Sequence, residues 1–383
     1  MNKESCSKGL AYNIMAIFYY LSYMFPVNRK KILLIMTHDD SDQGNVGSVY
    51  KYFQKKDPNL VFKKFKRGHY TFKRNNNFLR NLFLIFIVLP YHMATSHTIF
   101  MDNVFLPFSA IKPKKDTRLV QLWHGTGSIK KFGLDFEEGW VKDSGLRVNS
   151  RTTHFIVGSR WMKEVYKTAF RAPENKIYNL GCPRTDIFFN QNHIKEAKHE
   201  FNGEYPHLAK KTIILYAPTF RDDKESYIKL NIDELISNLD NDKVLALRFH
   251  PHIANKVNID EIASKKYSNR IIDFSHYPKL NTLLINTDIL ITDYSSIIYE
   301  YALINKPMIF FAYDLKKFEI SGRGFYEDYL STIPGPIAYN TQELVDIINN
   351  KSFMKYDLDK FKAFFLEKCD GKSRERLYKL LME

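Results

Sequence analysis

The stretch RLVQLWHGTGSIKKFG, residues 118–133, decides the fold. It begins as an apolar, strand-like run, stops at His124, and continues through small residues into two lysines. In parallel α/β sheets, the carboxyl ends of the strands carry the binding and catalytic groups. The stretch therefore predicts one buried parallel strand with a functional site at its end.

Further apolar, β-branched runs of similar length recur along the whole chain. They lie at 31–37, 97–102, 153–158, 212–218, 244–251, 288–293 and 307–312. Helical stretches alternate with them, for example at 160–170, 232–239, 295–305 and 341–350. Runs that are apolar on both faces and alternate with helices are typical of parallel sheets covered by helices. The pattern predicts doubly wound α/β architecture.

The polar stretch 190–211 interrupts this alternation, which restarts after it. We therefore expect two Rossmann-like domains facing across a cleft, an N-terminal one of residues 1–195 and a C-terminal one of residues 196–383. The ligand should lie at the carboxyl ends of the strands. The last helix, from about residue 372, is expected to pack back across the boundary.

The chain of 383 residues carries a formal net charge of +15 and three cysteines. The charge favours anionic partners such as acidic lipids or phosphorylated substrates, although a generally basic protein would show it too. The sequence contains no nucleic-acid-binding module, so no nucleic acid partner is expected. The cysteine number and spacing fit neither a disulfide framework nor a metal site, which favours a reducing compartment.

Two apolar runs near the N-terminus, residues 9–25 and 78–94, are flanked by basic residues. The first is short for a bilayer span and lacks a signal-peptide cleavage site. We predict N-terminal helices that associate with an anionic membrane surface. The alternative is that they are ordinary buried helices.

Polar side chains gather at four predicted strand ends. The first end carries His124, Gly125 and Thr126; the others carry Thr219 with Arg221, Arg248 with His250, and Asp293 with Ser295 and Ser296. A serine-capped helix N-terminus with Arg and His nearby suits a phosphate group. For any one of these ends alone, a plain helix cap or a core histidine would be the simpler explanation.

Metal signals are weaker. The D-x-D patterns at 40–42 and 240–242 and the histidine pair around Pro251 arise easily by chance. No P-loop, dinucleotide fingerprint or nucleophile elbow is present. No cofactor is required by the sequence, and Mg²⁺ stays an alternative.

Taken in order, several motifs resemble the CDP-glycerol glycerophosphotransferase family of teichoic acid synthesis. They are QLWHGTGSIKKFG, YAPTFR, RFHPH, DILITDYSSIIYEYALINKPMIFF, GRGFYEDYLSTIPGPI and DGKSRERL. The resemblance covers roughly residue 97 to the end and implies a GT-B-like fold. It also implies a peripheral enzyme on the cytoplasmic face of the cell membrane that takes CDP-glycerol and an undecaprenyl-diphosphate-linked acceptor.

The resemblance assigns roles to individual residues. It implies catalytic roles for His124 and His250, and a nucleotide-diphosphate site at Asp293, Ser295 and Ser296. Arg323, in GRGFYEDY, would be another phosphate contact.

Family members with a proline after Trp-His-Gly-Thr include chain-extending polymerases, and this chain has Gly127 and Ser128 there instead. That departure and the absence of a large extra N-terminal domain favour the priming type, which adds glycerol phosphate to a lipid-linked disaccharide. A glycerol- or ribitol-phosphate polymerase, or a capsule transferase, stays open. A sugar-transferring GT-B enzyme and a non-enzymatic binding protein are the alternatives from other classes.

Overall fold

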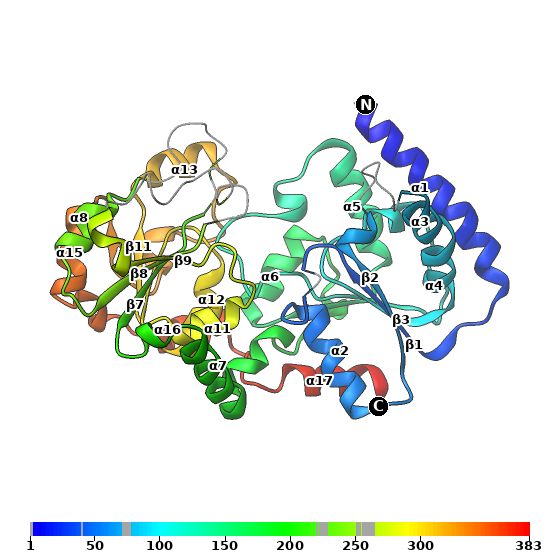
Figure 1. Ribbon diagram of the computed structural model, residues 1–383. Helices are drawn as coiled ribbons and strands as arrows, with labels where there is room; N and C mark the ends of the chain where they lie inside the picture. Colours follow the sequence, from blue (N-terminus) through cyan, green and yellow to red (C-terminus); the bar gives the residue numbers. More distant parts are fainter. Residues whose placement is uncertain are drawn as a thin grey trace. The chain divides into compact units, whose positions relative to one another are not determined.

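The computed structural model describes residues 3–39, 41–70, 78–219, 221, 229–249, 254 and 265–383. The chain divides into two compact units. Residues 1–126, 131–186 and 365–383 form the N-terminal unit, and residues 127–130 and 187–364 form the C-terminal unit. Each unit is built around a parallel sheet, so the predicted pair of parallel α/β domains is confirmed (Figure 1).

The N-terminal sheet has the strand order β2-β1-β3-β4-β5-β6, with all neighbours parallel. Its strands are β1 (Asn28–Met36), β2 (Val61–Lys66), β3 (Ser96–Met101), β4 (Arg118–Gln121), β5 (His154–Val157) and β6 (Ile177–Asn179). Its helices are α1 (Lys3–Leu21), α2 (Asn45–Lys56), α3 (Phe78–Phe83), α4 (Leu89–Thr95), α5 (Gly139–Arg151), α6 (Arg160–Ala169) and α17 (Ser373–Met382). A π-helical turn, Leu84–Val88, joins α3 to α4.

Alternate residues of β1 separate the two faces of this sheet. Leu33 and Ile35 pack beneath α1, α4 and the π-helical turn, whereas Ile32 and Leu34 pack beneath α2 and α17. This alternation is the two-residue period of a strand buried on both sides. Figure 1 shows α1, α3 and α4 together, away from α2 and α17.

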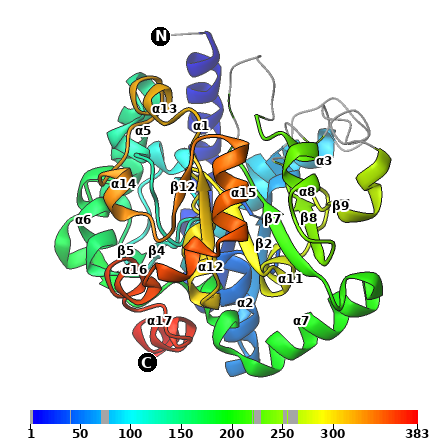
Figure 2. The ribbon, with the colours of Figure 1, turned by 90° about the vertical axis from the view of Figure 1, so that its left-hand side faces the viewer.

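The C-terminal sheet has the order β12-β11-β10-β7-β8-β9, again with parallel neighbours. Its strands are β7 (Thr212–Tyr216), β8 (Lys243–Leu247), β9 (Ile271–Asp273), β10 (Ile289–Thr292), β11 (Met308–Phe311) and β12 (Ile337–Ala338). Its helices include α7 (Gln191–Glu204), α8 (Ile232–Ser237), α11 (Leu280–Asn286), α12 (Ile297–Ile304), α13 (Leu315–Ser321), α14 (Tyr329–Thr332), α15 (Thr341–Asn349) and α16 (Leu358–Phe365). Helices α8 and α15 lie side by side over one face (Figure 2).

The domain boundary in the structure differs from the one that we expected from the sequence, between residues 195 and 196. The polar stretch expected to mark the boundary contains α7, and Ala197 of this helix packs against Phe188 and Ile285 of the C-terminal unit. The chain therefore changes units after Asp186. A sparse apolar stripe on a largely polar helix was enough to attach it, and such a stripe is hard to recognise in sequence.

The final helix returns to the N-terminal unit, as expected. Leu377 and Leu381 of α17 lie in the core beside α2. The carboxylate of Asp186 accepts hydrogen bonds from the backbone N–H groups of Ser373 and Arg374 and from the Arg374 side chain. An acidic side chain at this helix start neutralises exposed N–H groups and the helix dipole.

The two predicted N-terminal helical regions are present as α1 and as the segment from α3 to α4. Within the described residues, one helical stretch, Phe78–Thr95, is long and apolar enough to cross a bilayer, by length and composition only. Whether these helices meet a membrane stays a prediction.

Candidate functional site

Strand β4 ends earlier than expected, at Gln121, and the backbone then turns sharply. Trp123 has φ 57°, a left-handed conformation that costs a non-glycine residue about 1–3 kcal/mol. The Asn45 amide donates to the carbonyl oxygens of Leu122 and Trp123, at 3.3 and 3.0 Å. The Gln121 side chain accepts from the Trp123 N–H at 2.9 Å. The side chains of Asn45 and Gln121 thus stabilise the strained turn, and the turn fixes the backbone position of His124.

His124 is oriented by the end of the neighbouring strand β3. Its Nδ1 lies 3.2 Å from the backbone carbonyl oxygen of Asp102. A carbonyl oxygen can only accept, so this contact selects the tautomer with the proton on Nδ1. Nε2 of the neutral ring then carries the lone pair, which is the arrangement that a general base requires.

The Asp102 carboxylate explains why that carbonyl is fixed. It is almost fully buried and accepts hydrogen bonds from the backbone N–H groups of Thr37, His38 and Asp39 and from the Thr37 hydroxyl. Burial raises the pKa of Asp102, and these hydrogen bonds oppose the rise. The network joins the ends of β1 and β3 into one rigid support for His124.

A second imidazole lies directly against the first. The rings of His38 and His124 are stacked, with centroids 3.7 Å apart and planes 16° apart. Burial lowers the pKa of His38; the charges of Asp102 and Asp39 oppose this effect, and those of Arg67 and Arg184 add to it. The lowered pKa favours an uncharged His38. A neutral His38 does not repel the positive charge that His124 acquires when it takes up a proton.

The small residues after His124 do not share one role. The Thr126 side chain is buried, and its Oγ1 accepts from the Cys182 thiol at 3.6 Å, so it belongs to the packing beneath the turn. Gly125 is half-buried beside it. Arg184 donates to the His124 carbonyl oxygen at 2.8 Å and fixes the backbone from the other side.

In the C-terminal unit, Arg221 is the centre of a charged network. Its guanidinium donates to both carboxylate oxygens of Asp314, at 2.8 and 3.0 Å, to Asp293 at 2.8 Å, and to the Thr219 carbonyl oxygen at 2.8 Å. Burial by itself would lower the pKa of Arg221, but Asp314 and Asp293 outweigh it and the pKa is raised. The arginine predicted to bind substrate is therefore already paired and joins the ends of β7, β10 and β11.

Asp293 has both carboxylate oxygens engaged as well. Oδ1 accepts from the backbone N–H groups of Thr219 and Tyr294, and Oδ2 accepts from Arg221. The Thr219 hydroxyl is buried and has no hydrogen-bond partner within the described part of the chain. A buried, unsatisfied hydroxyl beside this network is a candidate ligand-binding atom.

The two serines that follow differ in exposure. Ser296 precedes α12 and is exposed, and its side chain makes no capping hydrogen bond. Ser295 is half-buried and accepts from the Ile297 N–H at a long 3.4 Å. The predicted double cap is thus weak, so the start of α12 is suited to binding an anion.

Arg248, also predicted to bind substrate, contacts backbone instead in this structure. Its Nη1 donates to the carbonyl oxygens of Phe274 and Tyr277, at 2.8 and 2.9 Å. Burial lowers the pKa of Arg248, and Asp273 opposes the effect. These contacts tie β8 to the segment after β9.

The motif that begins with His124 is divided between the units. Residues 127–130 belong to the C-terminal unit, where Lys130 pairs with Phe325 in an isolated antiparallel bridge and the Ile129 carbonyl accepts from the Tyr326 N–H. Gly127 allows close approach, since a Cβ there would lie 2.8 Å from the Tyr299 ring. Gly127 and Lys130 thus pack within the C-terminal unit.

Lys130 therefore joins the group of cations around Asp293. Burial lowers the pKa of its ammonium to about 8; Asp293 opposes the shift, and Arg323 and Arg221 add to it. The ammonium lies 5.7 Å from the centre of the Phe318 ring. Arg323 itself is exposed. Lys130 and Arg323 are the other two cations of this group.

The remaining predictions concern His250 and metals. His250, Pro251 and Asp40 lie outside the described residues. Asp240 and Asp242 of the second D-x-D pattern both pair with Lys243. The described part of the chain contains no group of three or more His, Cys, Asp or Glu side chains that could hold a metal ion.

Sequence reasoning missed His38, Asp102, Asp314 and the position of Lys130. His38 directly follows one predicted strand and Asp102 is the last residue of another, so a systematic reading of every strand end would have found them. Asp314 comes shortly after β11 and could have been found in the same way. Lys130 carries no such signal, because its place depends on a bridge to residue 325.

Comparison with known proteins identifies relatives along almost the whole chain. The chain is 31% identical over 384 residues to a teichoic acid ribitol-phosphate primase of Bacillus spizizenii, covering 96% of this chain and 93% of that protein. It is 34% identical over 360 residues to the teichoic acid poly(ribitol-phosphate) polymerase of the same organism, covering 92% of this chain but only 56% of that one.

A solved structure of a variant of the wall teichoic acid polymerase TagF superimposes with a TM-score of 0.78 at 25% identity. It covers 100% of this chain and 97% of that chain. The family model described as CDP-Glycerol:Poly(glycerophosphate) glycerophosphotransferase matches residues 17–383. The chain therefore belongs to the CDP-glycerol:poly(glycerophosphate) glycerophosphotransferase family.

Proposed function

We propose that this protein transfers glycerol phosphate from CDP-glycerol to a hydroxyl group of an undecaprenyl-diphosphate-linked disaccharide, and that it performs the priming step. The acceptor oxygen attacks the β-phosphorus, the bond from that phosphorus to the bridging oxygen breaks, and CMP leaves with the bonding electrons. The acceptor proton goes to a base. The observation that carries the proposal is the family match over almost the whole chain, together with the His124 and Asp293 groups at strand ends.

His124 is the proposed base. Its contact with the Asp102 carbonyl supports the tautomer that accepts a proton at Nε2. The stacked, uncharged His38 favours the imidazolium that forms when His124 takes the acceptor proton. A positioned base of this kind contributes about 10²–10⁴-fold to the rate.

The donor diphosphate is proposed to bind at the start of α12 near Asp293. Lys130, Arg323 and the Ser296 end of the helix supply positive charge there. Such charge stabilises the negative charge that builds up on the phosphoryl oxygens and on CMP. His250 is kept as a second proposed catalytic histidine from the family resemblance.

The priming step is proposed because this chain has Gly127 at a position where family members that include chain-extending polymerases have proline. Since a Cβ at this position would lie 2.8 Å from the Tyr299 ring, the proline of chain-extending members would not fit this backbone without a shift. The extent of the match to a primase is consistent with this choice. A ribitol-phosphate donor is the second candidate, because both relatives described above are named for ribitol phosphate.

The experiment is a product analysis. Purified protein is incubated with CDP-glycerol or CDP-ribitol and a lipid-linked disaccharide, and the lipid products are resolved by mass. One added glycerol phosphate is the expected result. A ladder of additions would contradict the priming step, and ribitol transfer would change the donor. In a parallel incubation with UDP-sugars, turnover of these donors alone would contradict the proposed reaction class.

The protein is further proposed to work at the cytoplasmic face of the cell membrane. Residues 5–38, 58–101 and 103–115, which cover α1 from residue 5 onward, the α3–α4 segment and β1–β3, hold fourteen Lys and Arg and no Asp or Glu; Glu4, Asp57 and Asp102 flank these ranges. Each such charge near an anionic surface contributes about 1 kcal/mol, and salt screens it. The protein should sediment with anionic vesicles at low salt and less so at high salt; equal binding to neutral vesicles would contradict the electrostatic part.

A further inference from the structure

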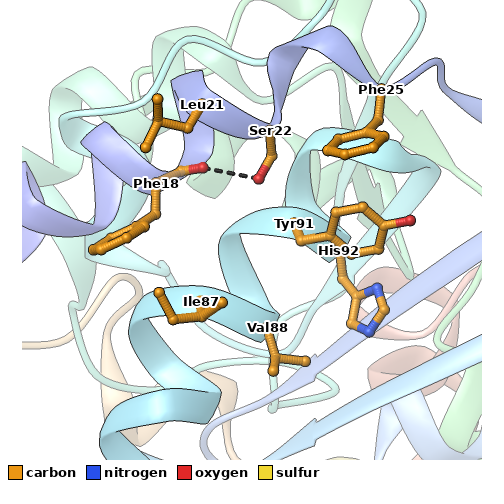
Figure 3. A pocket seen from close by; sticks show the side chains of 8 residues that line it. All are labelled: Phe18, Leu21, Ser22, Phe25, Ile87, Val88, Tyr91 and His92. Atoms are coloured by element: carbon orange, nitrogen blue, oxygen red, sulfur yellow. Dashed lines mark hydrogen bonds between the residues drawn. The ribbon is translucent and has the colours of Figure 1, made fainter.

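A pocket of about 390 Å³ opens between the end of α1 and the π-helix–α4 segment. Figure 3 shows the side chains that line it, which are Phe18, Leu21, Ser22, Phe25, Ile87, Val88, Tyr91 and His92. The volume falls within the range of small-ligand sites. Six of the eight side chains are aliphatic or aromatic without a charge, so an apolar ligand fits the lining.

The two clearly polar side chains do not change this character. The Ser22 hydroxyl already donates to the Phe18 carbonyl oxygen at 2.8 Å (Figure 3). Burial, with help from Lys31 and Lys63, lowers the pKa of His92 to about 4, so its ring is neutral at physiological pH. The lining therefore carries no charge, and a hydrocarbon would lose nothing by entering it.

The part of the chain that the structure describes leaves these walls partly open to solvent. Leu21 is 63% exposed and Phe25 45%, and Ile87 and Tyr91 are also exposed. Exposed apolar side chains that surround a hollow are typical of sites for apolar ligands or lipids.

Two lysines contact residues that line the pocket. Lys31 Nζ lies 4.6 Å from the centre of the Tyr91 ring, and Lys114 Nζ donates to the Phe25 carbonyl oxygen. The surrounding sequence, defined above, has no acidic residue. The complementary ligand is thus a hydrocarbon chain attached to an anionic group.

We propose that this pocket holds part of the hydrocarbon chain of the lipid-linked acceptor. The inference rests on the proposed function for the identity of that lipid. Both walls of the pocket lead into strands that support His124: Phe25 precedes β1, which leads to His38, and His92 precedes β3, which leads to Asp102. A six-residue strand spans about 20 Å, a distance that a long isoprenoid lipid can bridge from the pocket towards its head group.

The test measures binding in solution and needs no transferase activity, so it can fail independently of the proposed reaction. Titration calorimetry is run with alkyl phosphates of increasing length, below their micelle concentrations, and with inorganic phosphate. Affinity should rise about fourfold per added methylene and then stop rising once the pocket is full. A nonspecific apolar surface would give no such plateau, and tight binding of inorganic phosphate alone would also overturn the proposal.

Two variants fill the pocket, and one serves as a matched control. Ile87→Trp and, as a second filling variant, Leu21→Trp should weaken binding of the longer chains at least tenfold. Leu79→Trp lies on α3, is 78% exposed, does not line the pocket and should bind normally. Unchanged long-chain binding by both filling variants, with melting temperatures preserved, would overturn the proposal.

A last experiment distinguishes two lipids that could supply the hydrocarbon chain, the lipid-linked acceptor and a bilayer phospholipid. A prenyl phosphate should bind more tightly than a straight alkyl phosphate of equal carbon number, since its double bonds leave fewer rotations to freeze. If short-chain phosphatidylglycerol binds more tightly than the prenyl phosphate, the pocket belongs to a bilayer phospholipid and the assignment to the acceptor is wrong.

Discussion

The two groups of polar residues at the strand ends are built in opposite ways. Around His124, neutral imidazoles are held by a strained backbone turn and by hydrogen bonds to backbone groups. Around Asp293, the groups are charged, and Arg221 is neutralised by two carboxylates. A charged side chain at a strand end can therefore serve to hold the structure together, whereas a neutral side chain can be the proposed reactive group.

The largest expected effect is a loss of turnover, and it tests the proposed reactive role of the group around His124. His124→Ala should lower turnover by about 10²–10⁴-fold, because it removes the proposed base. CDP-glycerol affinity by calorimetry and the melting temperature should barely change. His199→Ala, an exposed histidine on α7, is the control and should keep full turnover. A large fall in melting temperature for His124→Ala would show a core role instead.

Arg221→Met tests the structural side. Removing one member of a buried charge network costs about 3–5 kcal/mol, since Asp293 and Asp314 stay behind without their partner. Denaturant unfolding should show this loss. The matched control is Arg160→Met, whose pair with Glu367 is exposed to solvent, so its loss should change the stability little. Equal losses in the two variants would contradict a structural role for Arg221.

Gly127→Ala tests the point where the motif passes into the C-terminal unit. The added Cβ would overlap the Tyr299 ring and should cost about 1–3 kcal/mol of unfolding free energy. Gly203→Ala, near the end of α7 with open space around it, should be neutral or stabilise by up to about 1 kcal/mol. If both variants melt alike, the close approach at Gly127 is not a constraint.

The smallest effect concerns pH. An anion binds the protonated form of Lys130, whose pKa lies at about 8. Donor affinity should therefore be constant below pH 8 and fall about tenfold per pH unit above it, as the ammonium loses its proton. Lys130→Arg should remove this fall, since arginine stays charged. Calorimetry with CDP-glycerol between pH 7 and 9.5 measures it, and an identical fall in Lys130→Met would assign it to another group.

The strands missed from the sequence follow a physical rule. Every strand expected from an apolar run is present, whereas β2, β6, β9 and β12 were not expected, and these four are the edges of the two sheets. A central strand is covered on both faces and flanked on both sides, so its sequence is continuously apolar. An edge strand such as β2, with sequence VFKKFK, is partly exposed and carries charge, so that signal is lost.

The sequence by itself determined the α/β class, the central strands, the family and the position of His124, because these depend on local runs and short motifs. Only the tertiary structure decided that Arg221 is neutralised, that Thr126 is buried, that His38 stacks on His124, and that Lys130 belongs with Asp293. Each of these depends on residues far apart in the chain. Pairing, burial and strain are properties of neighbours in space, which the order of residues along the chain does not reveal.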